Sequence, residues 1–102
     1  MPNNLEILLI PRAGDKEVVR DYFLTYMNMD KTELIERYNG AWKLGIVGSH
    51  HQGLQYYAMH QAFLRVFGRS PITLEGGCLL GLTNPICIDG DSWVYAGENG
   101  KE

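Results

Sequence analysis

Residues Ser49–Gly68, SHHQGLQYYAMHQAFLRVFG, decide the fold that this sequence predicts. Ser49 followed by Gln52 is a capping box that begins a helix, and Gly68 marks the end of that helix near Phe67. Apolar residues cover most of the circumference of this helix, whereas its polar strip is narrow. A helix of this kind is usually buried on several sides, so we expect the rest of the chain to pack around it.

Two shorter amphipathic helices are predicted before it. The first covers residues 16–28 with Asp15 as its N-cap, and its apolar side chains fall on one half of the helical wheel. The second begins at a capping box over residues 30–33 and ends near Lys43. Ahead of both, the apolar run 5–10 (LEILLI) is closed by a proline and is predicted to form a short buried strand.

After the long helix, the period of the apolar residues changes from that of a helix to that of a strand. The predicted strands are Ile72–Glu75, Cys78–Leu82, Ile86–Ile88 and Ser92–Tyr95. Two glycines at 76–77 predict a two-residue hairpin turn, and Asp-Gly at 89–90 predicts a type I′ turn.

The sequence therefore predicts an α+β fold with a short N-terminal strand, a three-helix cluster and a C-terminal antiparallel β-meander of three to four strands. A winged-helix-like arrangement is also possible, because it has the same order of helices followed by a β-hairpin. The length of 102 residues predicts one domain over 1–102, with flexible ends at about 1–4 and 97–102.

Pairing about these turns divides the strand residues between two faces of the sheet. The face predicted to meet the helices carries Ile72, Leu74, Leu79, Ile86, Ile88, Trp93 and Tyr95. The opposite face carries Cys78, Leu80, Leu82, Cys87 and Val94. This second face is too apolar to be freely solvated, so we expect the N-terminal strand or another subunit to cover it. A slip of one residue would exchange the two faces.

Composition and charge narrow the function classes. Hydrophobic residues make up 45% of the chain, which is an ordinary proportion for a globular protein. The formal net charge of −3 disfavours non-specific nucleic-acid binding. The N-terminus lacks the basic region of a signal peptide, and no stretch approaches the roughly 20 apolar residues that span a bilayer. The sequence therefore predicts a cytoplasmic location without membrane contact, and reduced, buried thiols at Cys78 and Cys87.

No catalytic, cofactor-binding or metal-binding residue is predicted. His50 and His51 are sequential and would project about 100° apart on a helix, so they do not easily share one ion. No spacing typical of a zinc site is present. Asp89 and Asp91 flank a glycine, where turn chemistry explains them. The two cysteines lie in predicted strands without a nearby positive charge.

The best candidate for a functional element is the second helix, the turn and the third helix. Ala41, Leu44, Gly45, Ile46 and Leu54 fall at spacings compatible with a helix-turn-helix, and a hairpin follows, where a winged-helix protein carries its wing. The candidate nucleic-acid contacts are Ser49, His50, His51, Gln52 and Gln55. The alternative is a plain αα-turn, because the third helix is long and apolar and has no basic residue before Arg65.

The favoured prediction is a non-enzymatic protein–protein interaction module whose partner is another protein or a second copy of the chain. It rests on the absence of catalytic signals and on the apolar excess of the third helix and the second sheet face. The candidate interface residues are Tyr57, Leu80, Leu82 and Val94. A winged-helix-like DNA-binding protein is the alternative.

Overall fold

The computed structural model describes residues 5–45, 49–82 and 84–96, and within them the chain has the predicted α+β class. The elements are β1 (Leu5–Leu8), α1 (Asp15–Met27), α2 (Lys31–Leu44), α3 (His50–Phe67), β2 (Ile72–Glu75), β3 (Leu79–Leu82), β4 (Ile86–Asp89) and β5 (Ser92–Tyr95). The ends predicted to be flexible lie outside the described residues.

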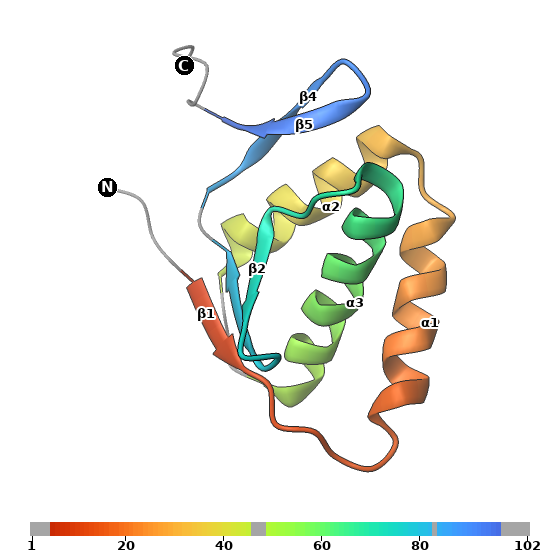
Figure 1. Cartoon of the computed structure of the whole chain (residues 1–102), viewed down its shortest axis with the longest axis vertical. Coiled ribbons are helices and arrows are strands. Elements are labelled where there is room, and N and C mark those ends of the chain that lie inside the picture. Colours follow the sequence, from red (N-terminus) through yellow and green to blue (C-terminus); the bar gives the residue numbers. More distant parts are fainter. Residues whose placement is uncertain (1–4, 46–48, 83, 97–102) are drawn as a thin grey trace.

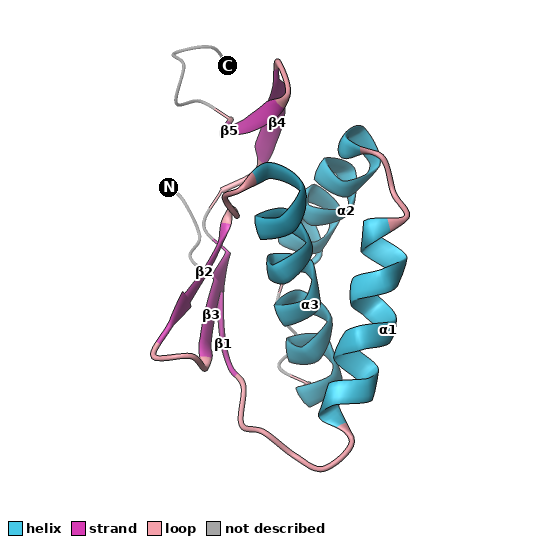
Figure 2. Cartoon of the chain, turned by 45° about the vertical axis from the view of Figure 1, so that its right-hand side comes forward, coloured by secondary structure: helices cyan, strands magenta, loops and turns pink. Residues whose placement is uncertain are grey.

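The long helix α3 is the central element, with α1 on one side of it and the sheet of β1, β2 and β3 on the other (Figure 1, Figure 2). Both ends lie at the predicted residues, and Ser49 forms its own part of the predicted capping box. The Ser49 hydroxyl accepts a hydrogen bond from the Gln52 backbone N–H at 3.0 Å, and Gly68 takes a left-handed φ of 80°. Along α3, Phe63 and Ala62 have no exposed surface, because neighbours cover the helix on several sides.

The two shorter helices begin with different caps. At α2, the predicted capping box is confirmed: Asp30 accepts from the Glu33 N–H at 2.8 Å, and Glu33 accepts from the Asp30 N–H at 3.0 Å. At α1, the predicted cap is wrong. Gly14 is the N-cap at a φ of 86°, and Asp15 is the first helical residue. The Asp15 carboxylate instead accepts from the backbone N–H of Arg12 at 2.6 Å.

The strands form two sheets rather than one meander. The first has the strand order β1-β3-β2, and the second contains β4 and β5. The predicted continuation from β3 to β4 is wrong because β1 pairs antiparallel with the edge of β3 that β4 would have used. A strand has only two edges, so β4 has to find its partners elsewhere.

The register of the first sheet differs from the prediction. Ile72 pairs with Leu82 and Leu74 pairs with Leu80, because the hairpin loop has three residues, 76–78, instead of two. Leu80 and Leu82, placed on the outer face by the sequence, therefore point toward the helices and have 0% exposed surface. A change of one residue in a loop moves a whole strand from one face to the other.

This register also changes the outer face of the first sheet. Glu6, Thr73 and Glu75 are exposed there, and Leu8 is 59% exposed. The face is mixed in character, so it lacks the continuous apolar surface that motivated a covering subunit. Self-association of the chain therefore stays a prediction, but an apolar outer face of the first sheet no longer supports it.

The second hairpin, β4–β5, is held to the rest of the fold by side-chain hydrogen bonds. Those of Asn39 bond backbone groups of β4 that a neighbouring strand could otherwise bond. The amide of Asn39 in α2 donates to the Ile86 carbonyl and accepts from the Ile86 N–H, both at 2.8 Å. Trp93 is 2% exposed, and its indole N–H donates to the Arg69 carbonyl at 3.2 Å. These contacts satisfy polar groups that a neighbouring strand would otherwise meet.

The faces of this hairpin follow the prediction, but its turn does not. Ile86 pairs with Tyr95 and Ile88 with Trp93, which places these four side chains on one face. Ile88 is nevertheless 47% exposed, because the hairpin extends beyond the helices (Figure 1). The turn residues are 90–91, and Asp91 does not have the positive φ that a type I′ turn requires.

Phe63 tests the central position of α3. Its side chain is fully buried and packs edge-to-face against Tyr38, with ring centroids 6.0 Å apart. We expect Phe63→Ala to lower the free energy of unfolding by about 3–5 kcal/mol, measured by urea denaturation. Leu64→Ala, at a 40% exposed site on the same helix, should change it by about 0.5 kcal/mol or less. Equal effects of the two substitutions would contradict the burial of this face.

Candidate functional site

The histidines at the start of α3 are bound to α1. Nε2 of His50 lies 2.9 Å and 3.1 Å from the two carboxylate oxygens of Asp15, and this hydrogen bond lowers the pKa of Asp15. Nε2 of His51 lies 2.5 Å from the hydroxyl of Tyr22, and the two rings meet edge to face. Both histidines therefore fasten α1 to α3.

The other predicted nucleic-acid contacts are also used inside the chain. Ser49 caps α3, and Gln52 is only 8% exposed. The Gln52 amide N–H donates to the Gly45 carbonyl at 3.2 Å and to the Tyr56 hydroxyl at 3.0 Å. Gln55 is half-buried. The structure thus brings the five residues onto one end of α3 but does not present them as one exposed surface. The i, i+4 spacing of Gln52 and Tyr56 was the signal that sequence reasoning missed.

The predicted interface residues do not come together. Tyr57 is half-buried on α3, and Val94 is half-buried on the second hairpin. Leu80 and Leu82 belong to the core, so the prediction that they lie at an interface is wrong. The reason is the register of the first sheet, which turns both side chains toward the helices. Of the four predicted interface residues, Tyr57 is the one that lines the surface hollow described next.

That hollow, here called the sheet-side groove, lies over α3 between α1 and the loops of the first sheet. It has a volume of about 470 Å³. Its lining residues are Leu9, Pro11, Asp15, Lys16, Val19, Arg20, Phe23, Leu54, Tyr57, Gln61 and Gly77. Leu54, Tyr57 and Gln61 supply its floor at the i, i+3, i+7 spacing of one helical stripe.

The charges of the sheet-side groove are mainly positive. Lys16 and Arg20 are exposed on α1, while the one acidic lining residue, Asp15, is paired with His50. The guanidinium of Arg65 lies 6.0 Å from the centre of the Phe23 ring and adds positive charge near the groove. The groove therefore combines an apolar floor with a basic rim.

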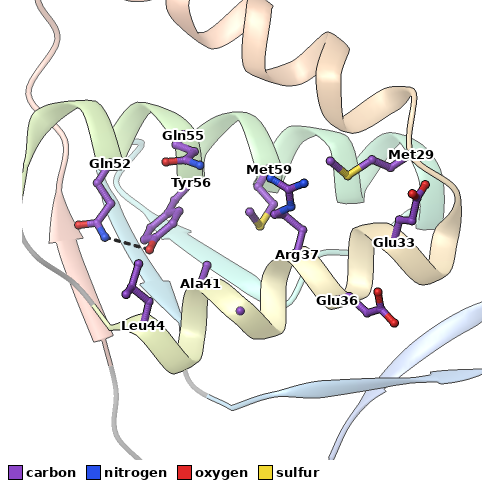
Figure 3. Close-up of a pocket in the computed structure, with 11 residues that line it drawn as sticks. Met29, Glu33, Glu36, Arg37, Ala41, Leu44, Gln52, Gln55, Tyr56 and Met59 are labelled. Carbon is purple, nitrogen blue, oxygen red and sulfur yellow. Dashed lines mark hydrogen bonds between the residues drawn. The ribbon is translucent and has the colours of Figure 1, made fainter.

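A second hollow, here called the three-helix pocket, lies between α2 and α3 with Met29 at one end (Figure 3). Its volume is about 500 Å³. Its lining residues are Met29, Glu33, Glu36, Arg37, Gly40, Ala41, Leu44, Gln52, Gln55, Tyr56 and Met59. Figure 3 shows Arg37 reaching from α2 toward Met59, and the bonded pair of Gln52 and Tyr56 at the other end.

Tyr26 of α1 has an unusual environment inside the fold. It is 1% exposed, yet its hydroxyl has no hydrogen-bond partner among the described residues. Burial raises the pKa of Tyr26, while the Gln55 amide and the Arg37 guanidinium act in the opposite direction. The Gln55 side chain therefore lies close to the Tyr26 hydroxyl. A buried polar group left unpaired is costly, so this position calls for an explanation.

The other titratable and thiol side chains of the described residues do not gather into a catalytic or metal-binding site. In the described ranges, no three His, Cys, Asp or Glu side chains gather as metal ligands. Cys78 and Cys87 are half-buried rather than buried as predicted, and they lie in separate parts of the fold. Nδ1 of His60 lies 2.9 Å from the Ser70 hydroxyl, and burial lowers the pKa of His60.

Comparisons with protein-family models, with curated proteins and with solved structures found no match. Over the described part of the chain, no helix has the length and apolar character needed to cross a membrane.

The stability of a Tyr26 variant tests whether its hydroxyl is unpaired. Tyr26→Phe removes a buried group without a partner, so we expect the free energy of unfolding to stay the same or to rise by about 1 kcal/mol. Tyr56→Phe is the matched control. It removes a hydroxyl that accepts from Gln52, and it should lower the free energy of unfolding by about 1 kcal/mol. An equal loss of stability in both variants, measured by urea denaturation, would show that the Tyr26 hydroxyl is bonded.

Proposed function

We propose that this protein is a non-enzymatic protein-interaction module that binds its partner in the sheet-side groove. The single observation that carries the proposal is the groove itself, where the apolar floor around Leu54 and Tyr57 is open at the surface beneath a basic rim. Tyrosine is enriched at protein interfaces, since it offers a large apolar ring with a polar end. Tyr57 is one of the four interface residues predicted from the sequence, and it lies at the centre of the floor stripe.

The chemistry of the groove indicates the kind of partner. A volume of about 470 Å³ suits a few anchoring side chains, as when an amphipathic helix places residues spaced i, i+3 or i+4 into a hydrophobic groove. Lys16 and Arg20 on the rim favour acidic side chains beside these anchors. We therefore propose a short amphipathic helical segment with acidic flanks as the partner.

Selection from a displayed library of helix-length peptides tests this proposal. We expect the selected peptides to share apolar anchors at helical spacing with acidic neighbours. Tyr57→Asp should weaken their binding by about tenfold or more, because it places a charge on the apolar floor. Arg20→Gln should weaken binding mainly at low salt, since a rim charge acts through screened electrostatics.

Leu24→Asp is the matched control for Tyr57→Asp. Leu24 is 52% exposed on α1 and does not line the groove, so this variant should bind the peptides like the unmodified protein. Selected peptides that bind the Tyr57→Asp variant as tightly as the unmodified chain would refute the groove as the binding surface.

DNA binding through the start of α3 is the second candidate function, and the hairpin β2–β3 after α3 is the observation in its favour. The contacts described above oppose it. Both histidines are bound to α1, Gln52 is buried, and the formal net charge is −3. A recognition helix needs its first turns free to enter a groove of the duplex.

We accordingly expect no salt-dependent binding to mixed-sequence duplex DNA at protein concentrations of about 1–10 µM in a mobility-shift assay. The physical reason is that α3 has no Lys or Arg before Arg65 and that the formal net charge of the chain is −3. A shift that weakens steeply with added salt, and that Gln55→Glu abolishes while Leu24→Asp leaves intact, would reverse the order of the two proposals.

A further inference from the structure

We propose that His50 sets the charge of the sheet-side groove, so that the groove binds its acidic partner more tightly at about pH 6 than at about pH 8. This inference rests on the proposed interaction function and adds a regulation to the same surface. One contact carries it. The imidazole of His50 lies against the carboxylate of Asp15, which is the one acidic side chain among the described residues that line the groove.

This contact joins the first residues of two helices. Asp15 begins α1 and His50 begins α3, and the two helices start at the same end of the fold (Figure 1). Nε2 of His50 lies 2.9 Å from one carboxylate oxygen of Asp15 and 3.1 Å from the other. Only 17% of the His50 side chain and 18% of the Asp15 side chain are exposed. A charge on the imidazole therefore acts on the carboxylate at hydrogen-bond distance, where solvent screens it less than at the open surface.

The protonation state of His50 changes the total charge at the groove. Lys16 and Arg20 supply the positive charges of the rim, and Asp15 supplies the negative charge of the lining. When His50 is neutral, Asp15 cancels part of the attraction that the rim exerts on an acidic partner. When His50 is protonated, it neutralises Asp15, and the full charge of the rim remains. Imidazole is the side chain whose charge ordinarily changes between about pH 5 and 8.

The Asp15 carboxylate keeps its charge over the same range. The hydrogen bond from His50 lowers the pKa of Asp15, and the Arg12 backbone N–H, which donates to the carboxylate at 2.6 Å, acts in the same direction. Asp15 therefore stays ionised between about pH 6 and about pH 8. The charge of the pair changes through the imidazole alone.

The groups that face His50 in the described part of the chain support this assignment. Arg12 of the loop before α1 and His51 of α3 share a surface hollow with it, and the segment 8–10 at the end of β1 brings only apolar side chains. The charge of Arg12 is constant over this range of pH. An imidazole at position 51 can change its charge there, but His51 bonds to Tyr22 and does not line the groove.

The charge of the groove can be measured without a partner. An anionic and a cationic nitroxide of similar shape are added in turn, and the relaxation of backbone amide protons is followed by NMR at about pH 8 and about pH 6. We expect the ratio of anionic to cationic relaxation at Lys16, Leu54 and Tyr57 to rise about threefold or more at the lower pH, as for one unit charge at roughly 8 Å in partly screened surroundings. His50→Gln should abolish this rise, because its amide can still donate to Asp15 but carries no charge. An unchanged ratio in the unmodified protein, or an equal rise in His50→Gln, would overturn the proposal.

Peptide binding extends the test to the proposed function. The probes are an acidic peptide obtained from the displayed library and an analogue in which Asn or Gln replaces each of its Asp and Glu residues. We expect the acidic peptide to bind the unmodified protein about threefold more tightly at about pH 6 than at about pH 8, and the analogue to bind equally at both. His50→Gln should remove this difference, whereas His51→Gln, the matched control, should keep it. Asp15→Asn should tighten binding at about pH 8 by a similar factor, since it removes the negative charge of the lining.

The outcomes separate the two proposals. Peptides that bind in the groove with the same affinity at both pH values would overturn the role of His50 and leave the interaction function intact. A pH dependence that His51→Gln removes and His50→Gln retains would overturn it as well. Peptides whose binding is indifferent to Tyr57→Asp would refute the interaction function, and a nitroxide ratio that still changes through His50 would support the pH-dependent charge alone.

Discussion

The burial of α3 on several sides is the constraint on which the rest of this structure depends. Most of its circumference is apolar, so α1, α2 and the first sheet each cover a different part of it (Figure 2). Neighbours that meet a helix from different directions leave hollows between them. The sheet-side groove follows the stripe of Leu54, Tyr57 and Gln61, and the three-helix pocket follows the stripe of Gln52, Tyr56 and Met59. Both candidate sites are thus consequences of how one helix is covered.

Polar side chains fix the position of the elements that cover α3. His50 and His51 bind Asp15 and Tyr22 and so set where α1 begins to cross α3. Asn39 bonds both backbone groups of Ile86 and holds the second hairpin against α2. Hydrogen bonds are directional, so such contacts specify an arrangement that apolar packing alone would leave less defined. Residues that look like binding groups in the sequence are here part of the architecture.

Tyr26 differs from these polar residues because its hydroxyl has no partner among those described. Sequences that specify a fold generally satisfy their buried polar groups, and departures from this rule are expected at functional positions. Gln55, whose side chain acts on the pKa of Tyr26, lines the three-helix pocket.

The sequence by itself determined the α+β class, the order of the elements, the ends of α3 and the capping box of α2, because these depend on local periodicity and on residues within one turn. Of the contact residues that it predicted, Tyr57 lines the sheet-side groove, and Gln52 and Gln55 line the three-helix pocket. The tertiary structure decided the split into two sheets, the burial of Leu80 and Leu82, and which side chains line the two hollows. Strand partners and pocket walls come from segments far apart in the chain, and a single extra loop residue reverses which side chains face inward. Such relations have no signature in local spacing, so only the folded chain could reveal them.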